Sequence, residues 1–204
     1  EFRVQHQGNV ATVPVKQADL KPGEFFSGGK FDFAGDGSEE FLEMAMVRYV
    51  AGAKTKAGYQ PTPKFGRAVS INHAYQILSN NPKFDPAKDY LKVSDPKWVT
   101  NSADFLFSQH GFAEVKTRAD LLGHASAIRN RVAHSSQKCR GDFKASAIHF
   151  LAPSTGQLTQ GYGPGDLLMA PVVRHFGTAA IGRGINHFTA YTDLFRALAD
   201  KVVP

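Results

Sequence analysis

The segment from residue 117 to residue 136, TRADLLGHASAIRNRVAHSS, constrains the fold most because it has the pattern of one long amphipathic helix. Its apolar residues recur at offsets of four, three and four, and so share one face: Leu121, Ala125, Ile128 and Val132. Thr117 precedes Asp120 by three residues, which is typical of an N-cap followed by an acidic first turn. The pattern predicts a helix over 117–135 that is anchored by its apolar stripe.

The end of this predicted helix carries Arg129, Asn130 and His134. A rotation of about 100° per residue places Asn130 and His134 on one face, whereas Arg129 lies roughly 140° from His134. An Arg–His pair therefore requires a bent or frayed last turn, or a second copy of the helix that supplies the complementary group. The plainer interpretation is that Arg129 and Arg131 are solvated and that His134 faces the negative end of the helix dipole.

The stretch IRNRVAH resembles the signature of the HEPN superfamily, which is Arg, a polar residue that is often Asn, three further residues and His. Arg129, Asn130 and His134 fill those positions. The resemblance covers one helix directly. It implies an all-helical fold, dimers that bring two motifs together, and the metal-independent endoribonuclease activity of many members. Other members of the superfamily have lost the activity and serve as binding modules.

Hydrophobic periodicity elsewhere predicts a mostly α fold, an antiparallel bundle of about five helices that includes the motif helix. The resemblance implies that this bundle is HEPN-like. The principal helices are expected near residues 38–56, 64–80, 102–111, 117–135 and 186–203. Asp142 and the following FKASAIHFLA predict a further helix of about ten residues, and 153–184 has the composition of a loop. We expect residues 38–204 to form a single HEPN-like domain.

Residues 1–37 predict an extended N-terminal arm or hairpin, with Gly8-Asn9 as its turn. Phe31 and Phe33 alternate with polar residues, which favours a strand covering the helices over rings that stack on bases. The wide apolar arc of helix 38–56 predicts central burial. Several aromatic and leucine side chains later in the chain are also expected in the core: Phe105, Leu106, Phe112, Phe188, Tyr191, Leu194, Phe195 and Leu198.

The charge of the chain favours a polyanionic partner. The 204 residues have a formal net charge of +6, and residues 116–144 hold seven Lys and Arg against two Asp. We therefore expect RNA as the partner, with four cations beside the motif as nucleic-acid-binding residues: Arg131, Lys138, Arg140 and Lys144. Such a charge is also compatible with solubility alone.

Other features bound the compartment. Cys139 is the only cysteine, which excludes an intrachain disulfide and a cysteine-rich zinc site and favours a reducing cytoplasm. No apolar run approaches the ~18 residues of a membrane span, so we expect no membrane partner. No signal peptide is visible, and the chain begins at Glu1 without Met, so we expect an expressed fragment or a processed product.

Competing chemistries have weaker signals. The chain has eight histidines but no His-Glu-x-x-His stretch, so we expect no metal ion and no other cofactor. The histidines outside the motif are expected to be scattered capping, surface or core residues, among them His73, His110, His124, His149, His175 and His187. Cys139 has no evident base to make it a nucleophile. The glycine-rich GQLTQGYGPGD lacks the Gly-Lys-Ser or Gly-Lys-Thr of a phosphate-binding loop.

Ribonuclease chemistry is better matched, because RNA supplies its own 2′-hydroxyl nucleophile and the protein needs an acid or base and a cation. Histidine titrates near pH 6.5, which suits His134 for proton transfer. The guanidinium of Arg129 matches phosphate oxygens, and Asn130 can orient the histidine or hold a phosphate oxygen. We expect a homodimeric metal-independent endoribonuclease that leaves a 2′,3′-cyclic phosphate. The alternatives are a non-catalytic module that binds RNA, a nucleotide or a protein, and an unrelated helical protein with a coincidental motif.

Overall fold

The computed structural model describes residues 2–6, 9–13, 25–26 and 37–204, with side chains from residue 39 onwards. Residues 37–204 form a mostly helical domain, 57% helix in nine helices, which confirms the mostly α prediction. The helices are α1 (Gly37–Val50), α2 (Ile71–Ser79), α3 (Pro96–Leu106), α4 (Ala113–Thr117), α5 (Ala119–Ala133), α6 (Gln137–Leu151), α7 (Pro164–Met169), α8 (Thr178–Gly182) and α9 (His187–Val202). No helix in the described ranges is long and apolar enough to cross a membrane.

Short strands accompany the helices: β1 (Phe2–His6), β2 (Asn9–Val13), β3 (Phe25–Phe26), β4 (Lys54–Thr55), β5 (Thr62–Pro63) and β6 (Phe107–Gln109). β1 pairs antiparallel with β2, and Phe2 lies opposite Val13. β3 pairs parallel with β4, and β5 pairs antiparallel with β6. The covering strand predicted at Phe31 and Phe33 falls outside the described residues.

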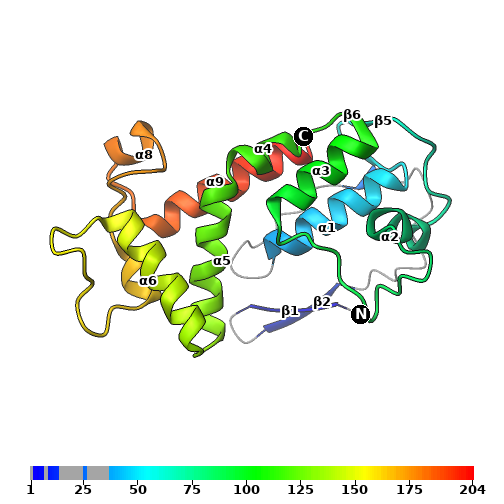
Figure 1. The fold of residues 1–204 in the computed structure, drawn as a ribbon. Coiled ribbons are helices and arrows are strands. Elements are labelled where there is room, and N and C mark those ends of the chain that lie inside the picture. Colours follow the sequence, from blue (N-terminus) through cyan, green and yellow to red (C-terminus); the bar gives the residue numbers. More distant parts are fainter. Residues whose placement is uncertain (1, 7–8, 14–24, 27–36) are drawn as a thin grey trace.

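Two lobes share the last helix (Figure 1). The α1 lobe contains α1 to α4, and the α6 lobe contains α5 to α8, with α5 and α6 side by side. α9 contributes to both hydrophobic cores, because Tyr191 and Leu194 are buried in the core of the α6 lobe and Leu198 and Val202 in that of the α1 lobe. The helix therefore joins the lobes through its buried face.

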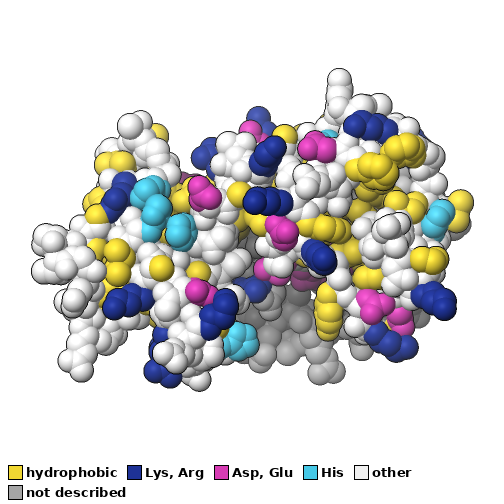
Figure 2. Space-filling view, in the orientation of Figure 1, with side chains coloured by type: hydrophobic (Ala, Val, Ile, Leu, Met, Phe, Trp, Pro, Cys, Tyr) yellow, Lys and Arg dark blue, Asp and Glu magenta, His cyan; other side chains and the backbone are white. Residues whose placement is uncertain are grey.

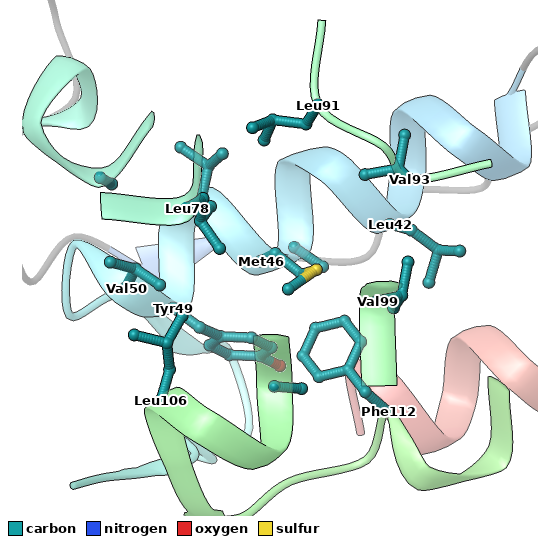
Figure 3. Close-up of a cluster of buried hydrophobic side chains, with 14 of the residues drawn as sticks. Leu42, Met46, Tyr49, Val50, Leu78, Leu91, Val93, Val99, Leu106 and Phe112 are labelled. Atoms are coloured by element: carbon teal, nitrogen blue, oxygen red, sulfur yellow. The ribbon is translucent and has the colours of Figure 1, made fainter. Parts of the chain in front are cut away.

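α1 is the central helix of its lobe, as its wide apolar arc predicted (Figure 3). Met46 is fully buried, and the ring of Tyr49 meets that of Phe112 edge-on at a centroid distance of 6.2 Å. The Tyr49 hydroxyl donates a 2.7 Å hydrogen bond to the carbonyl of Val202, which attaches the end of α9 to α1. The predicted extension of this helix to residue 56 is wrong, because Gly52 adopts a φ of 89° and turns the chain into β4.

α2 begins at Ile71, later in the chain than the predicted start at residue 64. Ser70 caps it by accepting a hydrogen bond from the backbone N–H of His73. The backbone before Ser70 is not helical but pairs with the end of α3, since the N–H of Lys64 donates to the carbonyl of Leu106 at 2.8 Å. The predicted stop is confirmed, because Asn80 takes a left-handed conformation at the C-cap.

α3 begins at Pro96, ahead of the predicted start at residue 102, and Asp95 caps it. A proline in the first turn costs the helix no hydrogen bond, so the sequence signal lay in that Asp-Pro pair. The core prediction holds for Leu106 and Phe112, which are buried. It is wrong for Phe105, whose side chain is 65% exposed.

The predicted helix 117–135 is divided. Thr117 is the last residue of α4, and its hydroxyl donates to the carbonyl of Ala113, so Thr117 is not an N-cap. Arg118, with φ of −105° and ψ of 11°, separates α4 from α5. α5 ends at Ala133, short of the predicted residue 135.

α6 starts at Gln137, five residues before the predicted start at Asp142. Ser136 caps α6 by accepting from the backbone N–H of Cys139, so the serine pair after the motif starts a new helix. The predicted loop 153–184 contains the short helices α7 and α8. The last helix agrees with the prediction within one residue at each end, except that Phe188 is 53% exposed and not in the core.

Candidate functional site

The motif lies on the part of α5 that the core does not hold. Of the predicted stripe, Leu121 and Ile128 are buried and Ala125 is half-buried, but Val132 is 71% exposed. The prediction that Val132 anchors the helix is therefore wrong. The last turn of α5 projects from the apolar core, which leaves the side chains after Ile128 accessible to a ligand.

Arg129 is directed towards α1. Its Nη1 donates to Oε1 of Glu39 at 2.9 Å, and its Nη2 donates to Oδ1 of Asn130 at 3.2 Å. The side chains of Arg129 and Glu39 are 31% and 27% exposed, so the ion pair lies at the edge of solvent. Asn130 thus orients the arginine in this structure.

His134 is the first residue after the helix, with extended backbone angles of φ −133° and ψ 140°. Its backbone N–H donates to the carbonyl of Asn130 at 2.8 Å, and its carbonyl accepts from Arg131 at 3.5 Å. Its imidazole is exposed and makes no hydrogen bond to any residue in the described ranges. Because the helix ends before His134, the angular separation of a straight helix does not apply to Arg129 and His134.

Arg129, Asn130 and His134 line one groove of about 910 Å³. Glu39 and Leu42 of α1 contribute to its lining, as do several side chains of α9. The groove thus lies where the two lobes meet. Its lining is mainly apolar with a few polar groups, which is the usual character of a ligand site, and its volume is within the usual range for one.

The four predicted nucleic-acid-binding residues lie outside the groove lining, around the α5–α6 connection. Lys138 forms an ion pair with Asp142 at 2.9 Å, and Nε of Arg140 donates to the carbonyl of Ser135. Arg131 contacts the backbone of His134, and Lys144 is exposed. These four cations therefore lie near the motif in the chain but not in its groove.

The groove contains a cation that the sequence reasoning missed. Arg196 of α9 contributes to the lining, and it makes no ion pair with any residue that the structure describes. Arg196 lies far from the motif in sequence but follows Thr192 by one helical turn on the last helix. Only the packing of α9 against α5 brings Arg196 into the groove with the motif.

Three histidines that were expected to be scattered are stacked in the α6 lobe. The rings of His124 and His149 are 4.5 Å apart, and those of His149 and His175 are 3.9 Å apart. Figure 2 shows histidine side chains gathered on this lobe. Burial lowers the pKa of His124 and of His149, and the neighbouring imidazoles lower both further. The residues come from three separate elements, so no local spacing signals the cluster.

The stack does not form a metal site. An imidazole lone pair lies in the plane of its ring, and the planes of these stacked rings are nearly parallel, so the lone pairs do not converge on one point. The described residues contain no group of three His, Cys, Asp or Glu side chains that could hold a metal ion.

Comparisons of this chain with models of protein families, with curated proteins and with solved structures find no match.

Proposed function

We propose that the protein is a metal-independent endoribonuclease with an HEPN-like helical bundle, acting in the cytoplasm. The observation that carries the proposal is that Arg129, Asn130 and His134 line one groove large enough for a nucleotide. The 2′-hydroxyl of RNA attacks the adjacent phosphorus, and the 5′-oxygen of the next nucleotide leaves. His134 accepts the proton that the 2′-hydroxyl loses, and the leaving 5′-oxygen gains a proton from an acid. Arg129 stabilises the charge on the phosphate oxygens.

The proposed active form is a homodimer. The exposed end of α5, with Val132 and His134, supplies the surface for a symmetric contact near the two-fold axis. A second motif then supplies the acid that complements the base of the first. Sedimentation at micromolar concentrations is expected to show a dimer, and a monomer that still cleaves RNA would eliminate the two-motif site.

The test is cleavage of a panel of structured and single-stranded RNAs by the full chain in EDTA. His134→Ala should slow cleavage by about 10²- to 10⁴-fold while RNA binding remains nearly intact. His73→Ala is the matched control, because His73 lies on α2 in the other lobe. RNA blocked at the 2′-hydroxyl should be bound but not cut.

Arg129→Ala should reduce both cleavage and binding, since it removes charge stabilisation and a phosphate contact together. Arg67→Ala is its control, because Arg67 is exposed and hydrogen-bonded to Gln60 away from the groove. An intact RNA panel with wild-type protein, or wild-type rates with His134→Ala, would rule out the ribonuclease.

The second candidate is a non-catalytic module that binds RNA through the same groove. The Glu39–Arg129 ion pair favours it, because the carboxylate already neutralises the arginine that catalysis requires for phosphate. Binding without cleavage by wild-type protein, in a range of ionic conditions, would select this function.

A further inference from the structure

The wall of the groove provided by α9 has an exposed aromatic ring. Phe188 lines the groove and is 53% exposed, although its helix buries a long apolar stripe. Single exposed hydrophobic residues are common and need no explanation. This one is different because the same groove holds the motif residues.

Polar groups continue along the same face of α9. Thr192 and Arg196 follow Phe188 at successive intervals of four residues, and all three line the groove. The rise of a helix places Arg196 about 12 Å along the axis from Phe188. The face thus combines an apolar ring with a cation that no described carboxylate neutralises.

This combination matches the chemistry of one ligand class. A nucleotide has a flat apolar base and a phosphate anion, and proteins bind single strands by stacking bases on aromatic rings beside cations. A base paired inside an RNA duplex does not present its face to a ring. From these features we infer that the groove holds an unpaired nucleobase stacked on Phe188, with Arg196 on a neighbouring phosphate.

The inference deepens the proposed function and rests on it for the identity of the RNA. It assigns single-stranded RNA as the substrate class, held by α9 while the motif on α5 acts on the adjacent phosphate. Arg196→Gln should accordingly weaken binding and reduce the dependence of affinity on salt, because one released counterion is lost.

The test measures the affinity of the full chain for short 2′-O-methyl RNA, which cannot be cleaved, as a single strand and as a duplex. A series of single strands carries one abasic position each. Wild-type protein should bind one strand of this series more weakly than the intact strand, namely the strand that lacks the stacked base. Phe188→Ala should weaken binding of the intact strand roughly 5- to 100-fold. In Phe188→Ala the abasic position should have no further effect, and duplex affinity should be unchanged.

Two further variants isolate stacking from folding. Phe188→Trp keeps an aromatic face and should retain single-strand affinity. Phe105→Ala removes a similarly exposed phenylalanine from α3 in the other lobe and should change nothing. Three results with Phe188→Ala would overturn the subsite. They are an equal loss of affinity for single strand and duplex, no loss of affinity, and dissociation of a dimer. The last would show that a second copy covers the ring.

The outcomes also separate the subsite from the proposed function. Abasic-sensitive binding through Phe188 without cleavage of any RNA would keep the subsite and remove the ribonuclease. Cleavage and binding that do not depend on Phe188 would keep the ribonuclease and remove the subsite. Absence of RNA binding by wild-type protein would remove both.

Discussion

α1 and α5 are helices of nearly equal length with opposite relations to the core. α1 buries much of its circumference, whereas α5 has two buried residues among 15. The motif lies on the poorly buried helix, and its residues follow Ile128, the last buried position. Stability is therefore concentrated in one helix and the candidate chemistry in the other, which allows the two to be perturbed separately.

The largest expected difference in stability comes from truncating one apolar side chain in each helix. Met46→Ala should lower the free energy of unfolding by about 2–5 kcal/mol, because Met46 is fully buried and the substitution leaves a cavity. At protein concentrations too low for a dimer, Val132→Ala should change it by less than about 0.5 kcal/mol, since Val132 is 71% exposed in the single chain. Urea denaturation measures both, and similar losses would show that α5 has a structural role that its burial does not reveal.

Two tyrosines provide the next test, because each donates to a backbone carbonyl in α9 or α5. Tyr49 bonds the carbonyl of Val202 at 2.7 Å, and Tyr191 bonds that of Leu121 at 3.2 Å. Val202 ends its helix, so its carbonyl has no partner one turn ahead, whereas the carbonyl of Leu121 lies inside α5. Tyr49→Phe should therefore cost about 1–3 kcal/mol and Tyr191→Phe about 1 kcal/mol or less.

Chemical denaturation of the two tyrosine variants gives the comparison directly. The two substitutions remove the same atom, so the difference between them reports the environment of each carbonyl. A larger loss for Tyr191→Phe would contradict the assignment and would show that the link from α9 to α5 carries more of the stability.

The contrast between α1 and α5 also explains how far the sequence predicts the fold. The arc of α1 and the stripe of α9 are continuous patterns of apolar residues, and both helices were predicted in type and, except at Phe188, in their buried faces. Local bonds set the boundaries that were wrong: the Ser136 cap starts α6 early, and the pairing of Lys64 with Leu106 keeps residues before Ser70 out of α2. Such hydrogen bonds depend on partners that the periodicity of apolar residues does not reveal.

The candidate site was predictable only where it is local. Arg129, Asn130 and His134 are close in sequence and share the groove. Glu39 and Arg196 approach them from α1 and α9, and only the packing of three helices brings them together. Phe188 was assigned to the core because it fits the stripe of α9, but the groove leaves its ring exposed.

A smaller effect is expected from the stacked histidines of the α6 lobe. The folded pKa values of His124 and His149 are lowered by burial, so below about pH 6.5 the unfolded chain binds more protons than the folded one. Stability should therefore fall as pH drops from 6.5 towards the folded pKa values. Asp120 opposes the shift, whereas His175 and Arg174 reinforce it for His149.

Thermal unfolding between pH 8 and pH 5 measures this dependence. His149→Gln should make the melting temperature less sensitive to pH, because it removes the middle ring of the stack. His73→Gln is the control, since His73 lies in the other lobe. An unchanged pH profile in His149→Gln would assign the dependence to other groups, of which buried His187 also has a lowered pKa.

The last expected change in stability concerns the ion pair that links α1 to α5. Glu39→Gln keeps the size of the side chain and removes its charge, so it should cost about 1 kcal/mol or less, as is usual for pairs at the edge of solvent. Its effect on RNA affinity should have the opposite sign, because binding becomes stronger where the fold becomes less stable. The carboxylate competes with phosphate for Arg129, and its removal makes the groove more positive, so affinity for uncleavable RNA should rise a few-fold and more so at low salt. If affinity falls instead, Glu39 serves to position Arg129 for the phosphate, and the well-packed helix contributes to the site through α5 after all.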